Sequence, residues 1–266
     1  MEPHLICLDL DGTLLRTDKT ISKRTEAVIQ ALKEKGHLIM IATGRPYRVS
    51  KEYYRQLRLE TPIVNFNGAY VHHPDDPGWG VYHTPIPLPV VENILRTCEA
   101  FHLQNIIVEH MDDVYIKNYD AELTESFKVN VGQLQIGPIF ENLKTDPTCV
   151  LIQTENSETE RLLKALDTQY TDAVHQRSWG NPSNMIEIIR NGVNKAVGIK
   201  RVAEYYHIPR ERIIAFGDED NDLEMLAYAG RGIAMGNAAE RIKQAADDVT
   251  LTNDEDGIAA YLERLL

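Results

Sequence analysis

Carboxylate side chains occur at two places in this sequence where a buried strand would end. Near the start of the chain, the stretch ICLDLDG brings Asp9 and Asp11 directly after apolar residues, and much later RIIAFGDEDND carries Asp218 and Asp222. A carboxylate at the end of a buried strand must find a cation or a set of hydrogen-bond donors, because an unpaired buried charge is very costly. The chemistry of this chain therefore depends on which positive groups meet these aspartates.

The elements around the first two aspartates alternate between strand and helix. The apolar run that ends at Asp9 predicts a first strand, and residues 37–42 and 61–66 predict two more. Ser22 can cap a helix between the first and second strands, and residues 50–57 suggest another helix between the second and third. This alternation predicts a parallel α/β sheet, whose ligand site lies beyond the carboxyl ends of the strands.

The pattern changes in the middle of the chain. Residues 84–184 mix strands and helices in an α+β manner, and this stretch is long enough for a separate small domain. The α/β alternation returns with an expected strand at 185–189. We therefore expect an α/β fold in which a Rossmann-like parallel-sheet core, residues 1–83 and 185–266, is interrupted by an inserted α+β cap domain.

The strand ends carry the groups that a metal-bound phosphate would need. Asp9 and Asp218, at the ends of strands expected to be neighbours, would repel each other at short range. A hard divalent cation relieves that repulsion, and Mg²⁺ favours one or two carboxylates together with water and phosphate oxygens. Asp222 lies one helical turn after Asp218 and can join the cation directly or through water. The sequence thus predicts a Mg²⁺ site at this edge of the sheet.

The remaining groups fit phosphoryl transfer. Asp9 can act as a nucleophile and form an aspartyl-phosphate, while Asp11, two residues on, can protonate the leaving oxygen and then activate water. Thr43 and the amides near Gly44 can hold phosphate oxygens at a strand-to-helix turn. Lys195 can supply a positive point charge to the phosphate and the nucleophile. The resulting hypothesis is an enzyme that hydrolyses a phosphomonoester.

Each of these residues also has a plainer interpretation. Asp222 can serve the dipole of a helix N-terminus, and Lys195 can be an ordinary exposed lysine, although a helix start is an unfavourable end for a cation. Arg45 can bind substrate or be a structural arginine. In the inserted region, Arg177 and Trp179 are among several residues that can select a leaving group or simply pack.

Four ordered motifs resemble those of a known superfamily. DLDGTLL, TGR, the isolated Lys195 and GDEDNDLEML are similar to the four motifs of the haloacid dehalogenase-like phosphatases. The insertion between the second and third motifs, and the segment NFNGAYV, resemble the Cof-type branch, which carries a class IIB cap. The resemblance spans residues 5 to about 250.

The resemblance implies a role for each motif residue. Asp9 would be the nucleophile and Asp11 the general acid and base. The implied metal ligands are the side chains of Asp9 and Asp218, the backbone oxygen of Asp11, and Asp222 in or near the coordination shell. The implied phosphate-binding residues are Leu10, Thr43, Gly44, Lys195 and Asn221, the last of which hydrogen-bonds the phosphate or positions Lys195.

Charge and cysteine content narrow the surroundings and partners. The 266-residue chain has a net charge of −12, which argues against nucleic acid or an anionic membrane as the main partner. Three widely spaced cysteines and the lack of an apolar run of about 20 residues indicate a cytoplasmic protein without a membrane span. We expect a small phosphorylated metabolite as partner, and a monomer or small homo-oligomer.

Two rival functions use similar groups. A phosphotransferase or phosphomutase would form the same aspartyl-phosphate and pass the phosphoryl group to another hydroxyl. A phospho-accepting signalling module also uses an aspartate at a strand end, Mg²⁺, threonine and lysine. Such a module is usually a single small domain and needs neither a cap nor Asp11.

Overall fold

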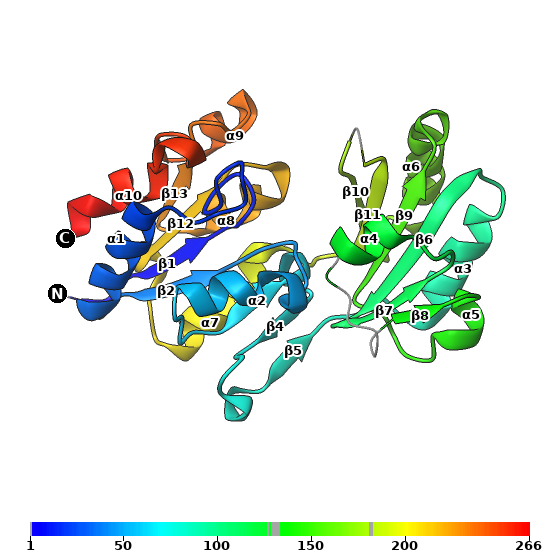
Figure 1. The fold of residues 1–266 in the computed structure, drawn as a ribbon, viewed down its shortest axis with the longest axis horizontal. Helices are drawn as coiled ribbons and strands as arrows, with labels where there is room; N and C mark the ends of the chain where they lie inside the picture. Colours follow the sequence, from blue (N-terminus) through cyan, green and yellow to red (C-terminus); the bar gives the residue numbers. More distant parts are fainter. Residues whose placement is uncertain (1, 127, 129–133, 181–182) are drawn as a thin grey trace. The chain divides into compact units, whose positions relative to one another are not determined.

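The structure is a computed structural model that describes residues 2–126, 128, 134–180 and 183–266 (Figure 1). It divides into two compact units, each with its own sheet and hydrophobic core. The first unit comprises Met1–Arg45, Ser50–Tyr82 and Asn194–Leu266, and the second comprises Pro46–Val49 and His83–Val193. The mixed α/β fold expected from the sequence is confirmed.

The first unit is built on a five-stranded parallel sheet with the order β14-β13-β12-β1-β2. Its strands are β1 (Leu5–Leu8), β2 (Leu38–Ile41), β12 (Ile213–Gly217), β13 (Arg231–Ala234) and β14 (Asp248–Val249). In β1, Leu5 pairs with Leu38 on one side and with Ile213 on the other. Because these strands run parallel, the segments that follow β1, β2 and β12 lie side by side at one edge.

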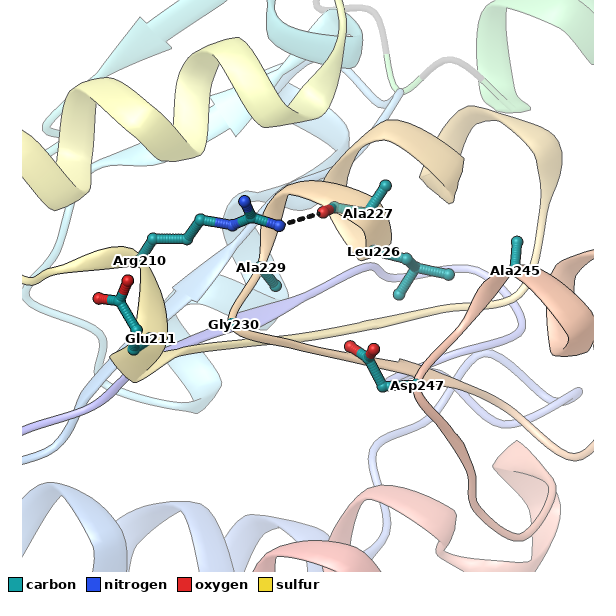
Figure 2. Close-up of a pocket in the computed structure, with 8 residues that line it drawn as sticks. All are labelled: Arg210, Glu211, Leu226, Ala227, Ala229, Gly230, Ala245 and Asp247. Carbon is teal, nitrogen blue, oxygen red and sulfur yellow. Dashed lines mark hydrogen bonds between the residues drawn. The ribbon is translucent and has the colours of Figure 1, made fainter.

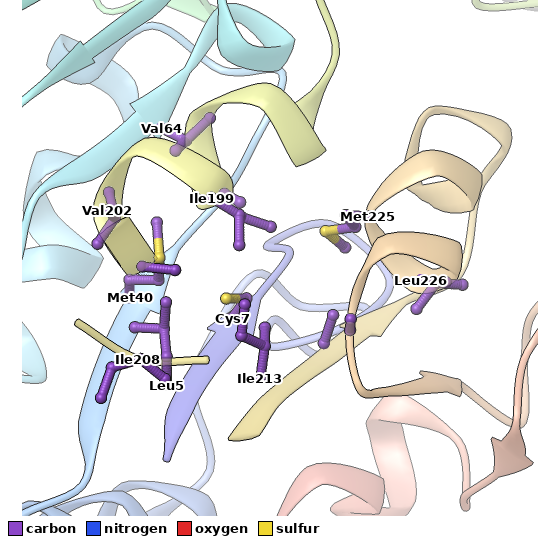
Figure 3. Close-up of a cluster of buried hydrophobic side chains, with 14 of the residues drawn as sticks. Leu5, Cys7, Met40, Val64, Ile199, Val202, Ile208, Ile213, Met225 and Leu226 are labelled. Carbon is purple, nitrogen blue, oxygen red and sulfur yellow. The ribbon is translucent and has the colours of Figure 1, made fainter. Parts of the chain in front are cut away.

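Helices pack around this sheet and bury its apolar residues. They are α1 (Lys23–Glu34), α7 (Lys195–Tyr205), α8 (Leu223–Tyr228), α9 (Glu240–Ala245) and α10 (Gly257–Leu262). Figure 3 shows side chains of β1, β2 and β12 meeting those of α7 and α8, with Cys7 near the centre of the cluster. The side chain of Ser22 accepts a hydrogen bond from the amide of Thr25, so the expected N-cap of the first helix is confirmed.

A small antiparallel sheet with the order β3-β4-β5 follows in the chain. Its strands are β3 (Ile63–Asn65), β4 (Tyr70–His72) and β5 (Val81–His83), and helix α2 (Tyr47–Gln56) precedes them. A tight turn, Phe66–Gly68, joins β3 to β4. Ala42, the residue after β2, forms a parallel bridge with Val64 of β3. Strand β3 therefore runs parallel to the end of β2, and the Phe66–Gly68 turn follows it directly.

The second unit contains a six-stranded sheet with the order β10-β11-β9-β6-β7-β8. Its strands are β6 (Leu103–His110), β7 (Asp113–Ile116), β8 (Leu134–Ile136), β9 (Cys149–Thr154), β10 (Val174–Ser178) and β11 (Met185–Arg190). Its helices are α3 (Leu88–Cys98), α4 (Ala121–Ser126), α5 (Ile139–Asn142) and α6 (Asn156–Tyr170). Helices α3 and α6 pack against one face through residues such as Leu95 and Leu166.

One placement made from the sequence was wrong. The strand at 185–189 was expected in the core sheet, but β11 pairs on both sides with strands of the second unit, β9 and β10. Its first five residues are all buried, which suits a central strand of either sheet. The chain returns to the first unit only at Asn194, immediately before α7.

Among the described helices, none combines the length and the apolar character required to cross a bilayer.

Candidate active site

The first aspartate after β1 meets a buried lysine. Asp9 is almost completely buried, and Nζ of Lys195 donates a hydrogen bond to Asp9 Oδ1 at 2.6 Å. Lys195 is the first residue of α7, whose N-cap Asn194 accepts a hydrogen bond from the amide of Val197. The Lys195 side chain is fully buried, so its interpretation as an ordinary exposed lysine is wrong.

The same lysine contacts a second carboxylate from the end of β12. Nζ of Lys195 donates to Asp222 Oδ1 at 2.6 Å, and both side chains are fully inaccessible to solvent. The other oxygen of Asp222 accepts hydrogen bonds from the amides of Asp218 and Glu219 at 2.9 and 3.0 Å. Gly217 makes this fold-back possible, because a Cβ at that position would collide with the Asp222 side chain.

Asp218 is fixed by the loop that follows Asp9. The hydroxyl of Thr13 donates to Asp218 Oδ1 at 2.7 Å, and the side-chain Nδ2 of Asn237 donates to Oδ2 at 3.3 Å. Gly12 adopts φ +75°, and a Cβ there would overlap the Asp218 carboxylate. The glycine of the DLDG stretch is therefore required both for its left-handed backbone and for the closeness of Asp218.

Three carboxylates gather around the buried ammonium of Lys195. Asp9, Asp218 and Asp222 each offer an oxygen, and these oxygens all lie within 4.8 Å of one another. Burial, opposed by Lys195 and reinforced by the neighbouring carboxylates, raises the pKa of Asp9 well above its usual value. Burial also raises the pKa of Asp218 to about 7. Lys195 itself is held protonated: although burial opposes its charge, Asp222 and Asp9 raise its pKa.

This donor set could hold a hard divalent cation. All three groups are carboxylates, the ligands that Mg²⁺ prefers, and Lys195 is the one ammonium that the described contacts bring to Asp9 and Asp222. A divalent cation would supply the missing positive charge. Three of the four acids predicted from the sequence to share a metal, Asp9, Asp218 and Asp222, lie in one buried cluster.

Asp11 points into a different environment. Nε and Nη2 of Arg45 donate to its two carboxylate oxygens, both at 2.6 Å, and Nζ of Lys19 donates to Oδ1 at 2.7 Å. Burial alone would raise the pKa of Asp11, but Arg45 and then Lys19 hold it below its usual value. Arg45 thus binds a catalytic candidate in this structure, and its guanidinium lies 5.6 Å from the ring centre of Tyr53.

The loop after β2 contributes the expected phosphate-binding residues. Thr43 is buried, its amide donates to the carbonyl of Val64, and its hydroxyl accepts a hydrogen bond from the amide of Arg45 at 3.1 Å. Gly44 lies between them in the chain. Leu10 has a fully buried side chain, so only its backbone could contact a phosphate.

Asn221 is linked to a residue that sequence reasoning did not select. Its Nδ2 donates to Oδ1 of Asn67 at 2.9 Å. Asn67 lies in the Phe66–Gly68 turn with φ 54° and ψ 27°, and Phe66 before it has φ 49°. A left-handed backbone at a non-glycine residue costs on the order of 1–3 kcal/mol and persists only where the surroundings enforce it.

Some of these partners carried a weak signal in the sequence. Thr13 and Asn237 each follow a strand of the parallel sheet, so topology alone places both at the site edge. Asn67 precedes a glycine, and the Asn-Gly pair indicates a left-handed turn without indicating its contacts. Lys19 lies in an exposed turn at φ 64°, and nothing in the sequence pointed to Asp11 as its partner.

A separate pocket lies at the amino ends of the strands of the same sheet, opposite to the aspartate cluster (Figure 2). Its lining comes from segments that precede β12, β13 and β14, including Arg210, Gly230 and Asp247. The Arg210 guanidinium donates to the carbonyls of Ala227 and Tyr228, at 2.8 and 2.6 Å. This pocket lies at the amino ends of the strands, whereas ligand sites of open α/β sheets lie beyond the carboxyl ends.

Comparisons with known proteins agree with the geometry. The family model of the haloacid dehalogenase-like hydrolases matches residues 6–262. The chain is 50% identical over 98% of its length, and 97% of the relative's, to 5-amino-6-(5-phospho-D-ribitylamino)uracil phosphatase YitU of Bacillus subtilis.

Solved structures give the same result. A haloacid dehalogenase-like hydrolase from Bacteroides thetaiotaomicron superposes with a TM-score of 0.84 at 27% identity, over 100% of both chains. The subclass IIB sugar phosphatase BT4131 superposes with a TM-score of 0.81 at 26% identity, over 98% of both chains. The family and branch inferred from the four motifs and the insertion are confirmed. This chain belongs to the haloacid dehalogenase-like hydrolase family and is a phosphatase of that family.

Proposed function

We propose that this phosphatase hydrolyses a small phosphomonoester through an aspartyl-phosphate formed on Asp9. The observation that carries the proposal is the contact of Lys195 with both Asp9 and Asp222, at 2.6 Å each, beside the carboxylate of Asp218. The lysine fixes the nucleophile's orientation and neutralises part of its charge. An anionic carboxylate can then approach an anionic phosphate at lower electrostatic cost.

The reaction has two halves. In the first, an oxygen of Asp9 attacks phosphorus, the bond from phosphorus to the ester oxygen breaks, and Asp11 donates a proton to the leaving alkoxide. In the second, the Asp11 carboxylate takes a proton from water, the water oxygen attacks phosphorus, and the bond to Asp9 breaks. Inorganic phosphate is released and both aspartates return to their starting states.

Other residues hold the phosphoryl group during both halves. We assign the Thr43 hydroxyl and the amides around Gly44 to donate hydrogen bonds to phosphate oxygens, with Asn221 and the backbone of Leu10 as further contacts. The side chains of Asp9, Asp218 and Asp222, with the backbone oxygen of Asp11, would hold Mg²⁺. When bound, that cation would screen the phosphate's negative charge.

The contact of Asp11 with Arg45 and Lys19 fits the second half of the reaction. Both cations favour the ionised form of Asp11, which is the form that activates water. In the first half, Asp11 must carry a proton, so the contact has to loosen when substrate arrives. This contact with Arg45 and Lys19 therefore makes the protonation of Asp11 depend on whether substrate or the phosphorylated intermediate occupies the site.

We propose 5-amino-6-(5-phospho-D-ribitylamino)uracil as the first substrate to test, because the relative at 50% identity carries that activity in its name. We assign the choice of leaving group to the inserted unit. The proposed substrate is tested by measuring kcat/KM for this compound, a hexose phosphate and pyridoxal phosphate. A preference of less than about tenfold for the first compound would contradict it.

The nucleophile is tested by Asp9→Asn and Asp9→Ala. Both variants should lose phosphate release. The control Asp172→Asn, which alters an exposed carboxylate, should retain it. Stoichiometric free phosphate from the unaltered chain supports hydrolysis. Transfer of the group to an added alcohol without free phosphate would favour a phosphotransferase, and one stable phosphorylation per chain would favour a signalling module.

A further inference from the structure

We propose that Asn67 is a positioning residue of the phosphate site, and that the Phe66–Gly68 turn aligns three phosphate-binding segments with one another. The inference rests on the proposed function, because it concerns the same site. It goes beyond the four motifs, none of which contains this turn. Three separate contacts carry it, one to each of the segments that follow β2, β12 and the second unit.

The first contact joins the turn to the loop after β2. The backbone amide of Asn67 donates to the carbonyl of Thr43 at 3.0 Å. The amide group of its buried side chain also lies against Gly44, where a Cβ would come within 3.1 Å of Asn67 Oδ1. Both the backbone and the side chain of Asn67 therefore define where the loop at residues 43–44 can lie.

The second contact joins the turn to the segment after β12. Nδ2 of Asn221 donates to Oδ1 of Asn67 at 2.9 Å, across 154 residues of sequence. A terminal amide rotates freely unless one of its ends is held. Since Asn67 holds the nitrogen end, the Asn221 carboxamide is restricted in its rotation before any ligand binds.

The third contact joins the turn to the start of α7. Gly68 has φ +102°, and a Cβ there would overlap the carbonyl oxygen of Asn194. Asn194 caps α7 and is followed directly by Lys195. A close backbone approach at Gly68 thus fixes the position of the residue that precedes the buried lysine.

The backbone of the turn supports a positioning role. Phe66, Asn67 and Gly68 have positive φ values of 49°, 54° and 102° in succession. Such a conformation is rare for a bulky residue such as phenylalanine and persists where its surroundings impose it. Here the surroundings are the three segments proposed to hold the phosphate, so the strained turn and the phosphate site constrain each other.

The test measures phosphate binding, because binding can be read without turnover. Asn67→Gly keeps the left-handed backbone and removes the carboxamide. His207→Gly is the matched control: His207 has φ 54°, is exposed, and lies after α7 outside the site. Binding of inorganic phosphate in the presence of MgCl₂ is measured by calorimetry, and phosphate release from the best substrate is measured in parallel.

We expect Asn67→Gly to weaken phosphate binding and to lower kcat/KM by about 10-fold or more, with an unchanged thermal midpoint, because a small misplacement of aligned groups is costly. His207→Gly should change neither. Asn221→Ala should weaken binding on its own, and Asn67→Gly should add little in that background, since contacting residues in one network are non-additive.

Several outcomes would overturn the inference. Unaltered binding in Asn67→Gly, or a loss that only follows the loss of folded protein, removes the positioning role. Full additivity with Asn221→Ala shows that Asn67 does not act through Asn221. Failure of the proposed function looks different: the unaltered chain would then bind no phosphate or release none, whatever the state of residue 67.

Discussion

Nζ of Lys195 and Oδ1 of Asp222 lie 2.6 Å apart, and neither side chain is accessible to solvent. The ammonium is shared with Asp9, so one buried cation contacts two carboxylates from the segments that follow β1 and β12. Removing one partner of a buried ion pair is strongly destabilising, because it leaves uncompensated charge in a medium that solvates it poorly. The stability of the core and the chemistry at Asp9 consequently depend on the same side chain.

Lys195→Met tests this dependence. We expect loss of activity by about 100-fold or more and a destabilisation of about 3–5 kcal/mol, measured by chemical denaturation without metal. Added Mg²⁺ should restore part of the stability, since it supplies positive charge to the same acids. Lys200→Met, which alters an exposed lysine of the same helix, should behave like the unaltered chain. Equal stability of the two variants would contradict the buried-cation argument.

The pKa of Asp218, raised to about 7 by burial, predicts a pH-dependent stability for the metal-free protein. In the folded state Asp218 keeps its proton up to about pH 7, while in the unfolded state it loses the proton near its ordinary value of 3.8. The folded state therefore binds more protons between these values, and stability falls as pH rises from about 4 to 7. The contribution of Asp218 to the thermal midpoint in chelator should therefore decline across that range, whereas His72 and His83, whose pKa values burial lowers to about 4, contribute in the opposite direction.

Asp218→Asn provides the comparison, because it removes the ionisation while keeping the shape. Relative to the unaltered chain, the thermal midpoint of this variant in chelator should become higher as pH rises from about 4 to 7. With Mg²⁺ present, the unaltered chain should bind metal more tightly as pH rises, since the ligand must lose its proton. A metal affinity that does not depend on pH in this range would count against Asp218 as a ligand.

The contact of Asp11 with Arg45 and Lys19 predicts a shift in the pH profile of kcat. Lys19→Met removes one of the two cations that hold the pKa of Asp11 low, so this pKa should rise. If water activation limits turnover, the acidic limb of the kcat profile should move to higher pH. Lys23→Met, at a side chain that is 95% exposed, serves as the control. Coincident profiles for both variants would show that Lys19 does not set the ionisation that limits turnover.

Two glycines with positive φ separate backbone strain from site disruption. Gly12 has φ +75° and lies against Asp218, whereas Gly36 has φ +87° and open space where a Cβ would stand. Alanine at either position incurs a backbone cost of about 1 kcal/mol, visible in the thermal midpoint. Only Gly12→Ala should also lower kcat/KM, because its methyl group displaces the Asp218 carboxylate. Comparable activity in the two variants would contradict the close approach at Gly12.

Topology explains which parts of the site could be predicted from the sequence. Asp9, Thr43 and Asp218 each follow a strand, and a parallel sheet brings such positions to one edge whatever the details of packing. The Arg45–Asp11 and Asn67–Asn221 contacts depend instead on side-chain rotamers and on the positive φ at Phe66, which no local pattern encodes. They could be seen only in three dimensions.

The misplacement of β11 has a similar cause. Met185–Arg190 is an apolar strand that is buried on both faces, and its composition suits a central strand of either sheet. Its partners β9 and β10 are fixed by tertiary pairing, which hydrophobic periodicity does not reveal. Lys195 was recognised as important from its place in the motif order, but its complete burial between two carboxylates required the structure.

The pairing of β1 with β12 also bears on synthesis by the ribosome. Leu5 pairs with Ile213, so one side of β1 lacks its partner until synthesis has reached Ile213. At about 5–20 residues per second, that interval is on the order of 10–40 s. During it, the unpaired N–H and C=O groups along that side of β1 are open to wrong partners, in a nascent chain whose nucleophile does not yet have its surroundings.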